Sequence, residues 1–234
     1  MEITLNQSVQ LMHAKVFESL KAWAGYEALE AAIRECSGVS VYLAGGAVRD
    51  LMRFDGRKPK DFDFFLAGAG IERFLECLSI AGDLRVGPFG SPRWFPQGAP
   101  DRYADVVPIA RFYNGLWSCK DIVDALNQFD FTANAVALDL RTPRLFDPQH
   151  GVRDLKSGII RAVRFDYPDE PISAGGTLTR LCVLWFRLIH YSQVLKFEVE
   201  PVTMQWLRSH SHFAAGAASF EKTFFKPVWE TFHL

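Results

Sequence analysis

Apolar residues recur every three or four positions along the first part of the chain. Val9 and Met12 begin this series, which continues to Ile33. That spacing is typical of one face of a helix. Gly25 interrupts the series, so the sequence predicts an amphipathic helix over residues 9–35, or a helix pair broken near that glycine.

Short runs rich in β-branched and aromatic residues then alternate with helical patterns. A polar turn at 55–60 lies in the middle of this alternation. The predicted elements are a strand at 39–46, a helix at 47–54, a strand at 61–68 and a helix at 71–82. An order of this kind predicts a sheet with helices packed on it.

The middle of the chain carries fewer regular patterns. Residues 83–118 are rich in glycine, proline and aromatic residues, and they contain one clear strand candidate at 102–109. Residues 131–140 and 144–148 resemble two strands joined by a turn at 142–143, so we expect a hairpin there.

The last part of the chain is predicted to be mainly helical. The expected elements are a short helix at 151–158, an extended segment at 159–165, and helices at 177–192, 200–209 and 217–232. The stretch at 168–176 is the most linker-like part of the sequence. We therefore expect one domain over 1–167, with a helical N-terminal extension, and a short helical region over 168–234.

The composition supports a folded domain without a general attraction for nucleic acid. Hydrophobic residues make up 49% of the chain and aromatic residues 14%, which is enough for a substantial core. Lys and Arg number 26 against 27 Asp and Glu, and the formal net charge is −1. A polyanionic partner would therefore need a local basic patch.

Two absences in the sequence narrow the class of protein. Neither a signal-peptide pattern nor an apolar stretch long enough for a bilayer is visible, so we expect a cytoplasmic protein without membrane contact. The four cysteines are widely spaced and form neither a CxxC pair nor a Cys–His cluster, which argues against a zinc site.

A glycine pair follows the first predicted strand. Gly45 and Gly46 stand where that strand would meet a helix, and Arg49 follows about one helical turn later. Glycines let a ligand approach the backbone closely, and a helix start offers free N–H groups that suit a phosphate. The guanidinium of Arg49 would suit the same anion.

Two aspartates begin the next predicted strand. Asp61 and Asp63 are separated by one residue, which places both carboxylates on one face of a strand. Adjacent carboxylates repel each other unless a cation neutralises them, and hard oxygen ligands favour Mg²⁺. Asp105, on the strand candidate at 102–109, is the natural third ligand for a two-metal site.

Each of these features alone has an ordinary structural explanation. A glycine pair before a helix is usually only a turn, two aspartates near a strand end are usually solvated, and a single Asp105 is usually a surface residue. The joint order of strand, glycine pair, helix, polar turn and paired aspartates is much more specific. It favours a site for a nucleotide and a metal ion.

These segments resemble a known family. GGAVRD (45–50) followed by KDFDFF (60–65) is similar to the head domain of the class II tRNA CCA-adding enzymes and bacterial poly(A) polymerases, which are polymerase-β-like nucleotidyltransferases. DFTANAVALDL (130–140) resembles the family's RRDFTINA motif, and LFDPQHGVRDLKSGIIRAV (145–163) its DPxxGxxDLxxGxIR segment. The resemblance implies an α+β fold with a mixed sheet and flanking helices, followed by a small neck-like helical region.

The resemblance also implies roles for particular residues. Asp61, Asp63 and Asp105 match the catalytic positions that hold Mg²⁺. The matching nucleotide-binding positions are Gly45, Gly46, Arg49, Arg111, Asp130, Asn134 and Arg180. The implied partners are an NTP, either ATP or CTP, and the 3′ end of an RNA such as tRNA.

The chain departs from the family pattern in two places. Gln128 and Phe129 stand where the family has two arginines before DFT, which removes two positive charges. GGTLTR (175–180) stands where the family's EDxxR motif is expected, so only Arg180 of that motif remains. Without the acidic residues, a protein-templated choice of C and then A is not supported. The region after 177 has room for about three helices, and we do not expect a full tRNA-measuring apparatus in it.

Three functions are consistent with these observations. The first is an NTP-dependent nucleotidyltransferase acting on an RNA 3′ end, and the second is a transferase of the same chemistry acting on a small molecule or a protein. The third is a non-catalytic nucleotide- or RNA-binding subunit. The aromatic residues of the C-terminal helices are expected to form a helical core, or an interface for a homo-oligomer or a partner subunit.

Overall fold

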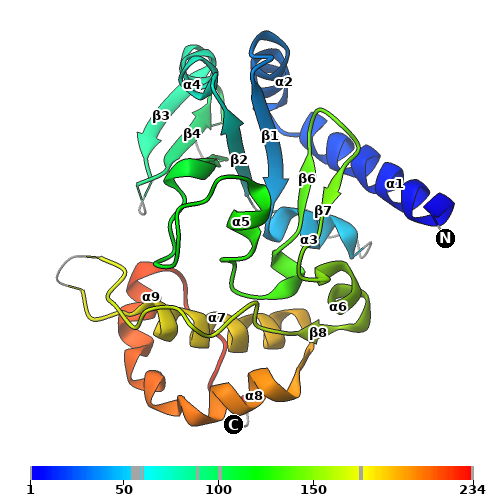
Figure 1. The fold of residues 1–234 in the computed structure, drawn as a ribbon. Coiled ribbons are helices and arrows are strands. Elements are labelled where there is room, and N and C mark those ends of the chain that lie inside the picture. The colour runs from blue at the N-terminus through cyan, green and yellow to red at the C-terminus, as the bar shows by residue number, and fades with distance from the viewer. Residues whose placement is uncertain are drawn as a thin grey trace. The chain divides into compact units, whose positions relative to one another are not determined.

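The computed structural model describes residues 2–53, 59, 61–87, 90–99, 102–173 and 176–232, with side chains from residue 10 onward (Figure 1). These residues fall into two compact units. The first comprises residues 1–113, 118–126 and 136–147, and the second comprises 114–117, 127–135 and 148–234. No helix among the described residues is long and apolar enough to cross a membrane.

The first unit is built on one mixed sheet. Its strands, in spatial order, are β3 (Gly82–Val86), β4 (Pro92–Pro96), β5 (Ala104–Pro108), β2 (Phe62–Gly68), β1 (Val39–Ala44), β6 (Ala137–Asp139) and β7 (Leu145–Phe146). The β2–β5 pair is parallel, and every other pair of neighbours in this sheet is antiparallel. The expected α+β fold with a mixed sheet is confirmed.

Helices precede the first strand of this sheet and connect its later strands. They are α1 (Glu2–Lys21), α2 (Tyr26–Glu35), α3 (Gly46–Met52), α4 (Ile71–Ile80), the 3-10 helix η1 (Ile109–Arg111) and α5 (Ile122–Leu126). The predicted break at Gly25 is confirmed, because α1 and α2 are separate helices. Helices α2 and α4 pack against one another (Figure 1).

Strand β2 places different chemistry on its two faces. Phe62 and Phe64 are buried on the same face, where both rings pack against Trp23 at centroid distances of 5.2 and 6.0 Å. Trp94 of β4 completes this cluster at 5.5 Å from Trp23. Because side chains alternate along a strand, Asp63 points to the opposite face. The aromatic cluster therefore fixes the orientation of the aspartate segment.

Replacing Trp23 by alanine is expected to lower the free energy of unfolding by about 3–4 kcal/mol, because it opens a cavity under β2 and β4. Urea unfolding of the variant measures this loss. Tyr113→Ala is the matched control, since Tyr113 is 59% exposed and its removal should cost far less. Equal losses in the two variants would contradict a central packing role for Trp23.

The second unit is mainly helical. Its elements are η2 (Thr132–Asn134), α6 (Gly151–Ser157), β8 (Ile159–Ile160), α7 (Arg180–Leu195), β9 (Glu198–Val199), α8 (Pro201–Ser209), η3 (Ser211–Gly216) and α9 (Ala217–Thr223). Strands β8 and β9 form a parallel pair, which joins the 148–167 region to the C-terminal helices. Residues 148–167 therefore belong to the same compact unit as the C-terminal helices, and the two units alternate along the chain before residue 148.

The C-terminal aromatic residues form a core within the second unit. Trp185 and Phe186 of α7 and Phe220 of α9 are fully buried, and Trp229 packs against both α7 rings. Thr179 caps α7 by accepting a hydrogen bond from the Cys182 N–H. Of the two predictions for these aromatics, the helical core is confirmed.

Four elements among the described residues differ clearly from the sequence predictions. Strands β3 and β4 were not predicted, because Pro92 and Pro96 at the ends of β4 and the exposed polar positions of β3 hide the strand pattern. The last helix ends at Thr223 rather than 232, since Pro227 disfavours helical backbone before it. Helix α5 was also missed, and it spans only five residues.

The ring of His190 is partly buried in the second unit. Its Nδ1 accepts a hydrogen bond from the Val228 N–H at 3.0 Å, and the ring packs against Phe225. Burial, together with the charge of Arg187, lowers the pKa of His190 to about 4. Between that pKa and the ordinary value near 6.5, the unfolded chain binds a proton that the folded chain does not.

Stability is therefore expected to fall as the pH is lowered from about 6.5 to about 4, by about 2 kcal/mol for this group, with the partial exposure of the ring taken into account. The His190→Asn variant keeps an acceptor near Val228 but does not titrate. Its unfolding free energy should change less over this window than that of the wild type. Parallel pH curves for the two proteins would contradict the assignment.

Candidate functional site

The turn between β1 and α3 is built on two glycines. Gly45 has φ 74° and ψ −140°, a conformation in which a side chain would be strained. Its N–H donates to the Val136 carbonyl at 3.2 Å, which ties the turn to the chain just before β6. Gly46 begins α3. The predicted strand–glycine–helix order is therefore observed.

Arg49 lies against this turn. The residue is only 6% exposed, and its guanidinium donates to the Asp50 carboxylate at 2.7–2.8 Å. A Cβ atom built on Gly46 would lie 3.5 Å from Arg49 Nη2, so the guanidinium is folded back over the first residue of α3. The structure thus brings Gly45, Gly46 and Arg49 together, as the sequence suggested.

The paired aspartates lie next to this turn in the sheet. Ala44, the last residue of β1, pairs with Asp63 of β2, and Asp63 pairs in turn with Asp105 of β5. Asp105 is paired on its other side with Arg93 of β4. In-register residues on neighbouring strands point to the same face, so Arg93, Asp105 and Asp63 form one row of side chains. We call these three residues the charged row.

Asp105, the predicted third metal ligand, is paired with an arginine. Its Oδ1 accepts from Arg93 Nε at 2.7 Å and its Oδ2 from Arg93 Nη2 at 2.9 Å. Within the part of the chain that the structure describes, no group of three or more His, Cys, Asp or Glu side chains is placed to hold a metal ion. Asp61, Asp63 and Asp105 therefore do not form the expected three-carboxylate metal site, although Asp63 and Asp105 are neighbours in the sheet, and Asp105 is instead paired with Arg93.

The charges of the three aspartates all affect the pKa of one residue, Tyr103. Tyr103 lies beneath the Arg93 guanidinium, which is 3.9 Å from the ring centroid. Burial raises the pKa of Tyr103 and Arg93 lowers it, while the charges of Asp61, Asp105 and Asp63 raise it further. Asp61 directly precedes β2, and its charge also raises the pKa of Arg93. The charges of all three aspartates therefore reach Tyr103.

Arg111 lies at the end of η1, in the first unit. Its guanidinium donates to Glu72 of α4 at 2.9 Å, and both side chains are largely exposed. The structure thus places this predicted nucleotide-binding residue in a surface ion pair. Such a pair contributes little to stability, so a polyphosphate would compete with Glu72 at a small cost.

Asp130 and Asn134 belong to the second unit. Asp130 accepts hydrogen bonds from its neighbour Phe131, from the Asn134 amide at 3.1 Å, and from Arg187 Nε at 2.7 Å. The Asp130 side chain is only 12% exposed. The two predicted residues are therefore in contact, and their partner Arg187 was not predicted.

A signal for Arg187 is present in the sequence. It interrupts the apolar run of 181–189, where a buried arginine requires a carboxylate partner. Nothing in the one-dimensional pattern says that the partner lies 57 residues earlier, at Asp130. Asp130 can therefore be identified as the partner of Arg187 only from the three-dimensional structure.

Arg180 begins α7 and is mostly buried. Its Nη1 lies 3.8 Å from Glu170, and a Cβ atom built on Gly115 would lie 2.8 Å from its Nε. The side chain thus packs against the 114–117 turn of the same unit. Its predicted contact with a nucleotide stays a prediction.

The departures at 128 and 129 have a structural role. Gln128 is fully buried, its Oε1 accepts from the Asn114 N–H at 3.2 Å, and its Nε2 donates to the Trp117 carbonyl at 2.8 Å. The Phe129 carbonyl accepts a hydrogen bond from the Tyr167 hydroxyl at 2.7 Å. Where the family has two charges, this chain therefore has a neutral brace for the 114–117 turn.

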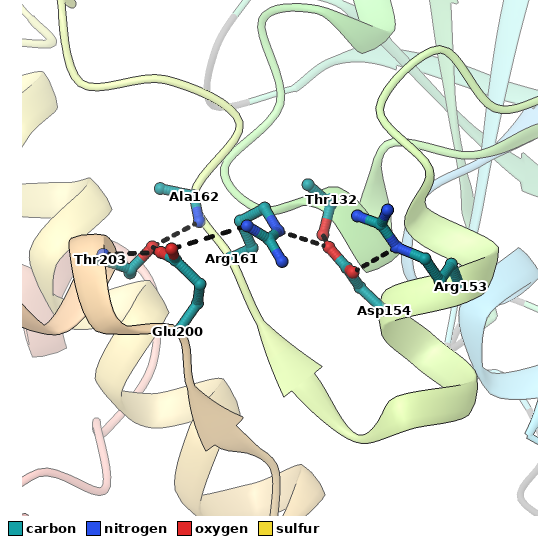
Figure 2. A network of polar contacts seen from close by, with 7 residues as sticks. All are labelled: Thr132, Arg153, Asp154, Arg161, Ala162, Glu200 and Thr203. Atoms are coloured by element: carbon teal, nitrogen blue, oxygen red, sulfur yellow. Dashed lines mark hydrogen bonds and ion pairs between the residues drawn. The ribbon is translucent and has the colours of Figure 1, made fainter.

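The Asp154 carboxylate organises a polar network in the second unit (Figure 2). It is 1% exposed and accepts from Thr132 Oγ1 at 2.8 Å, Arg161 Nε at 2.9 Å and Arg153 Nε at 3.3 Å. Burial opposes its ionisation, but hydrogen bonds from Arg161 and Thr132 outweigh that effect and lower the pKa of Asp154.

The network continues from Arg161 into α8. Arg161 Nη1 lies 3.6 Å from Glu200, whose Oε2 caps α8 by accepting from the Thr203 N–H and hydroxyl. The Thr203 hydroxyl also accepts from the Ala162 N–H at 3.1 Å. The Asp and Arg of the DLxxGxIR segment therefore join motif residues to the C-terminal helices, which is a structural role.

Replacing Gln128 by arginine, which restores the family's residue type, is expected to destabilise the protein by about 3 kcal/mol. The substitution would bury an unpaired charge and break both bonds to the 114–117 turn. Thermal or urea unfolding measures the loss. Gln97→Arg is the matched control, since Gln97 is exposed. An unchanged stability of the Gln128 variant would show that the site accepts the cation.

Comparison with known proteins identifies relatives of this chain. Residues 102–161 match the poly A polymerase head domain. A multifunctional CCA protein of Xanthomonas axonopodis pv. citri is 30% identical over 164 residues, which are 64% of this chain and 37% of that protein. A CCA-adding enzyme of Actinobacillus succinogenes is 29% identical over 180 residues, which are 74% of this chain and 41% of that protein. The chain thus spans about two fifths of the length of these curated relatives.

Solved structures of CCA-adding enzymes are also similar to this chain. The Thermotoga maritima CCA-adding enzyme complexed with tRNA(CCA) superimposes with a TM-score of 0.62 and 26% identity, covering 83% of this chain and 44% of that one. A CCA-adding enzyme in complex with ATP gives a TM-score of 0.59 and 27% identity, covering 79% of this chain and 40% of that one.

Proposed function

We propose that this chain, which contains a head domain of the class II CCA-adding and bacterial poly(A) polymerase type, is a metal-dependent nucleotidyltransferase. It transfers a nucleoside monophosphate from an NTP to the 3′ hydroxyl of an RNA such as tRNA and releases pyrophosphate. We further propose that it acts in the cytoplasm, where both substrates are available.

One observation carries this proposal. The glycine turn follows directly after Ala44, and Ala44 pairs with Asp63 across the β1–β2 ladder. A turn whose backbone a phosphate can approach thus adjoins two carboxylates suited to a hard cation. Arg49, folded over Gly46, supplies positive charge at the same turn.

Asp61 and Asp63 fit a magnesium ion. Mg²⁺ in proteins is held by one or two carboxylates, and substrate phosphate oxygens complete its coordination. Asp105 does not fit this role, since both its oxygens accept hydrogen bonds from Arg93. When bound, the metal would lower the pKa of the attacking hydroxyl and offset charge on the phosphates.

The reaction is an in-line displacement at the α-phosphorus of the NTP. The 3′ oxygen of the acceptor forms a new bond to that phosphorus, and the bond from phosphorus to the bridging oxygen of the β-phosphate breaks. The hydroxyl proton passes to solvent, and pyrophosphate leaves with the electron pair of the broken bond. Gly45, Gly46 and Arg49 would hold the triphosphate, because a guanidinium and open backbone suit its oxygens.

The assignment of partners rests on relatives. Solved relatives are complexed with ATP and with tRNA(CCA), so we propose ATP or CTP as donor and an RNA 3′ end as acceptor. Roles for Arg111, Asp130, Asn134 and Arg180 in nucleotide binding are proposed from the motif match alone. Arg187 joins this group because it pairs with Asp130.

The test is transfer of label from each of the four α-labelled NTPs, supplied separately with RNA and Mg²⁺. Labelled RNA is expected from ATP or CTP, and Asp61→Asn and Asp63→Asn should each reduce the rate by at least about a hundredfold, since each removes charge from the metal site.

Asp83→Asn is the matched control for these variants. Asp83 is an exposed aspartate of β3 paired with Arg85, and its loss should leave the rate unchanged. Full activity in the Asp63 variant would sink the proposed mechanism. Label that appears in a protein or a small molecule, and not in RNA, would show a different acceptor.

A further inference from the structure

Arg93 is the cation of the charged row, and no sequence motif marks it as a site residue. It lies on β4, next to Asp105 in the register of the sheet, and Asp105 lies next to Asp63. Each step across the row is one strand spacing, about 5 Å. The row therefore places a fixed guanidinium beside two carboxylates, one of which belongs to the proposed metal pair.

The geometry around Arg93 restrains its position. Two hydrogen bonds of 2.7 and 2.9 Å join it to both oxygens of Asp105, and its guanidinium lies over the Tyr103 ring. The side chains of Arg93 and Asp105 are 23% and 26% exposed, so solvent weakens the pair less than it would a surface pair. The hydrogen bond to Asp105, and the charges of Asp105 and Asp61, raise the pKa of Arg93.

A bidentate arginine and a metal ion compete for the same carboxylate oxygens. A second cation at Asp105 would have to break both hydrogen bonds and would then face the positive charge of Arg93. The guanidinium already provides one positive charge at that end of the row. It therefore neutralises Asp105 without a second metal.

We propose that Arg93 is a positioning residue that occupies Asp105 and restricts metal binding at this site to Asp61 and Asp63. This inference rests on the proposed function, because it concerns the same metal site. It differs from the arrangement that the family resemblance implied, in which Asp105 is a third ligand.

The test is Mn²⁺ binding to the full chain without nucleotide, followed by the paramagnetic resonance signal of the free ion. Asp63→Asn should lower Mn²⁺ affinity by at least about tenfold, while Asp105→Asn should change it by less than about threefold. Arg93→Gln should raise the affinity by about tenfold, or add a second bound ion, because it releases Asp105.

Two further variants test whether the higher Mn²⁺ affinity of Arg93→Gln comes from the release of Asp105. The double variant Arg93→Gln with Asp105→Asn should lose the gain, and Arg93→Lys, which keeps the charge, should bind Mn²⁺ like the wild type. Thermal melting of each variant confirms that it is folded. If Arg93→Gln does not fold, the comparison of Asp105→Asn with Asp63→Asn decides the question.

The outcomes separate this inference from the proposed function. A tenfold loss in Asp105→Asn, or no gain in Arg93→Gln, overturns the role of Arg93 and leaves the proposed transferase standing. Absence of Mn²⁺ binding, or binding that does not depend on Asp63, overturns both.

Discussion

The alternation of side chains along β2 is the constraint on which the candidate site depends. Phe62 and Phe64 are buried against Trp23, and the residues between and before them must then face the other side of the sheet. Burial of two aromatic rings is worth several kcal/mol, far more than the repulsion of two partly solvated carboxylates in water. The hydrophobic face thus holds the aspartates in place.

The sequence was sufficient for the elements and the motifs of the first unit. Helical spacing predicted α2 and α4, runs of β-branched and aromatic residues predicted β1 and β2, and the glycine pair indicated the turn that the structure shows. Arg93 could not be predicted, because its meaning depends on the pairing of β4 with β5. Prolines at both ends of β4 hide that strand from a pattern search.

In the second unit, one motif matches the family pattern and another departs from it, and the residues of both have structural roles. Asp154 and Arg161 of the DLxxGxIR segment are joined in a polar network, since a buried carboxylate needs hydrogen-bond and charge partners. Gln128 stands at a position where the family has charge, and its amide joins two backbone groups of the 114–117 turn. The departure at Gln128 is visible in the sequence, but its burial and the hydrogen bonds at both ends of its amide depend on the fold.

The register of the β2–β5 ladder also has a consequence for folding. Side chains alternate between faces, so a slip of β5 by one residue would move Asp105 beneath Trp23 and turn Ala104 toward the carboxylates. That misaligned state would bury an unpaired charge, and Arg93 would lose its partner. The Arg93–Asp105 pair beside the proposed metal site therefore also favours the correct strand alignment, and it disfavours the misaligned state before any ligand is present.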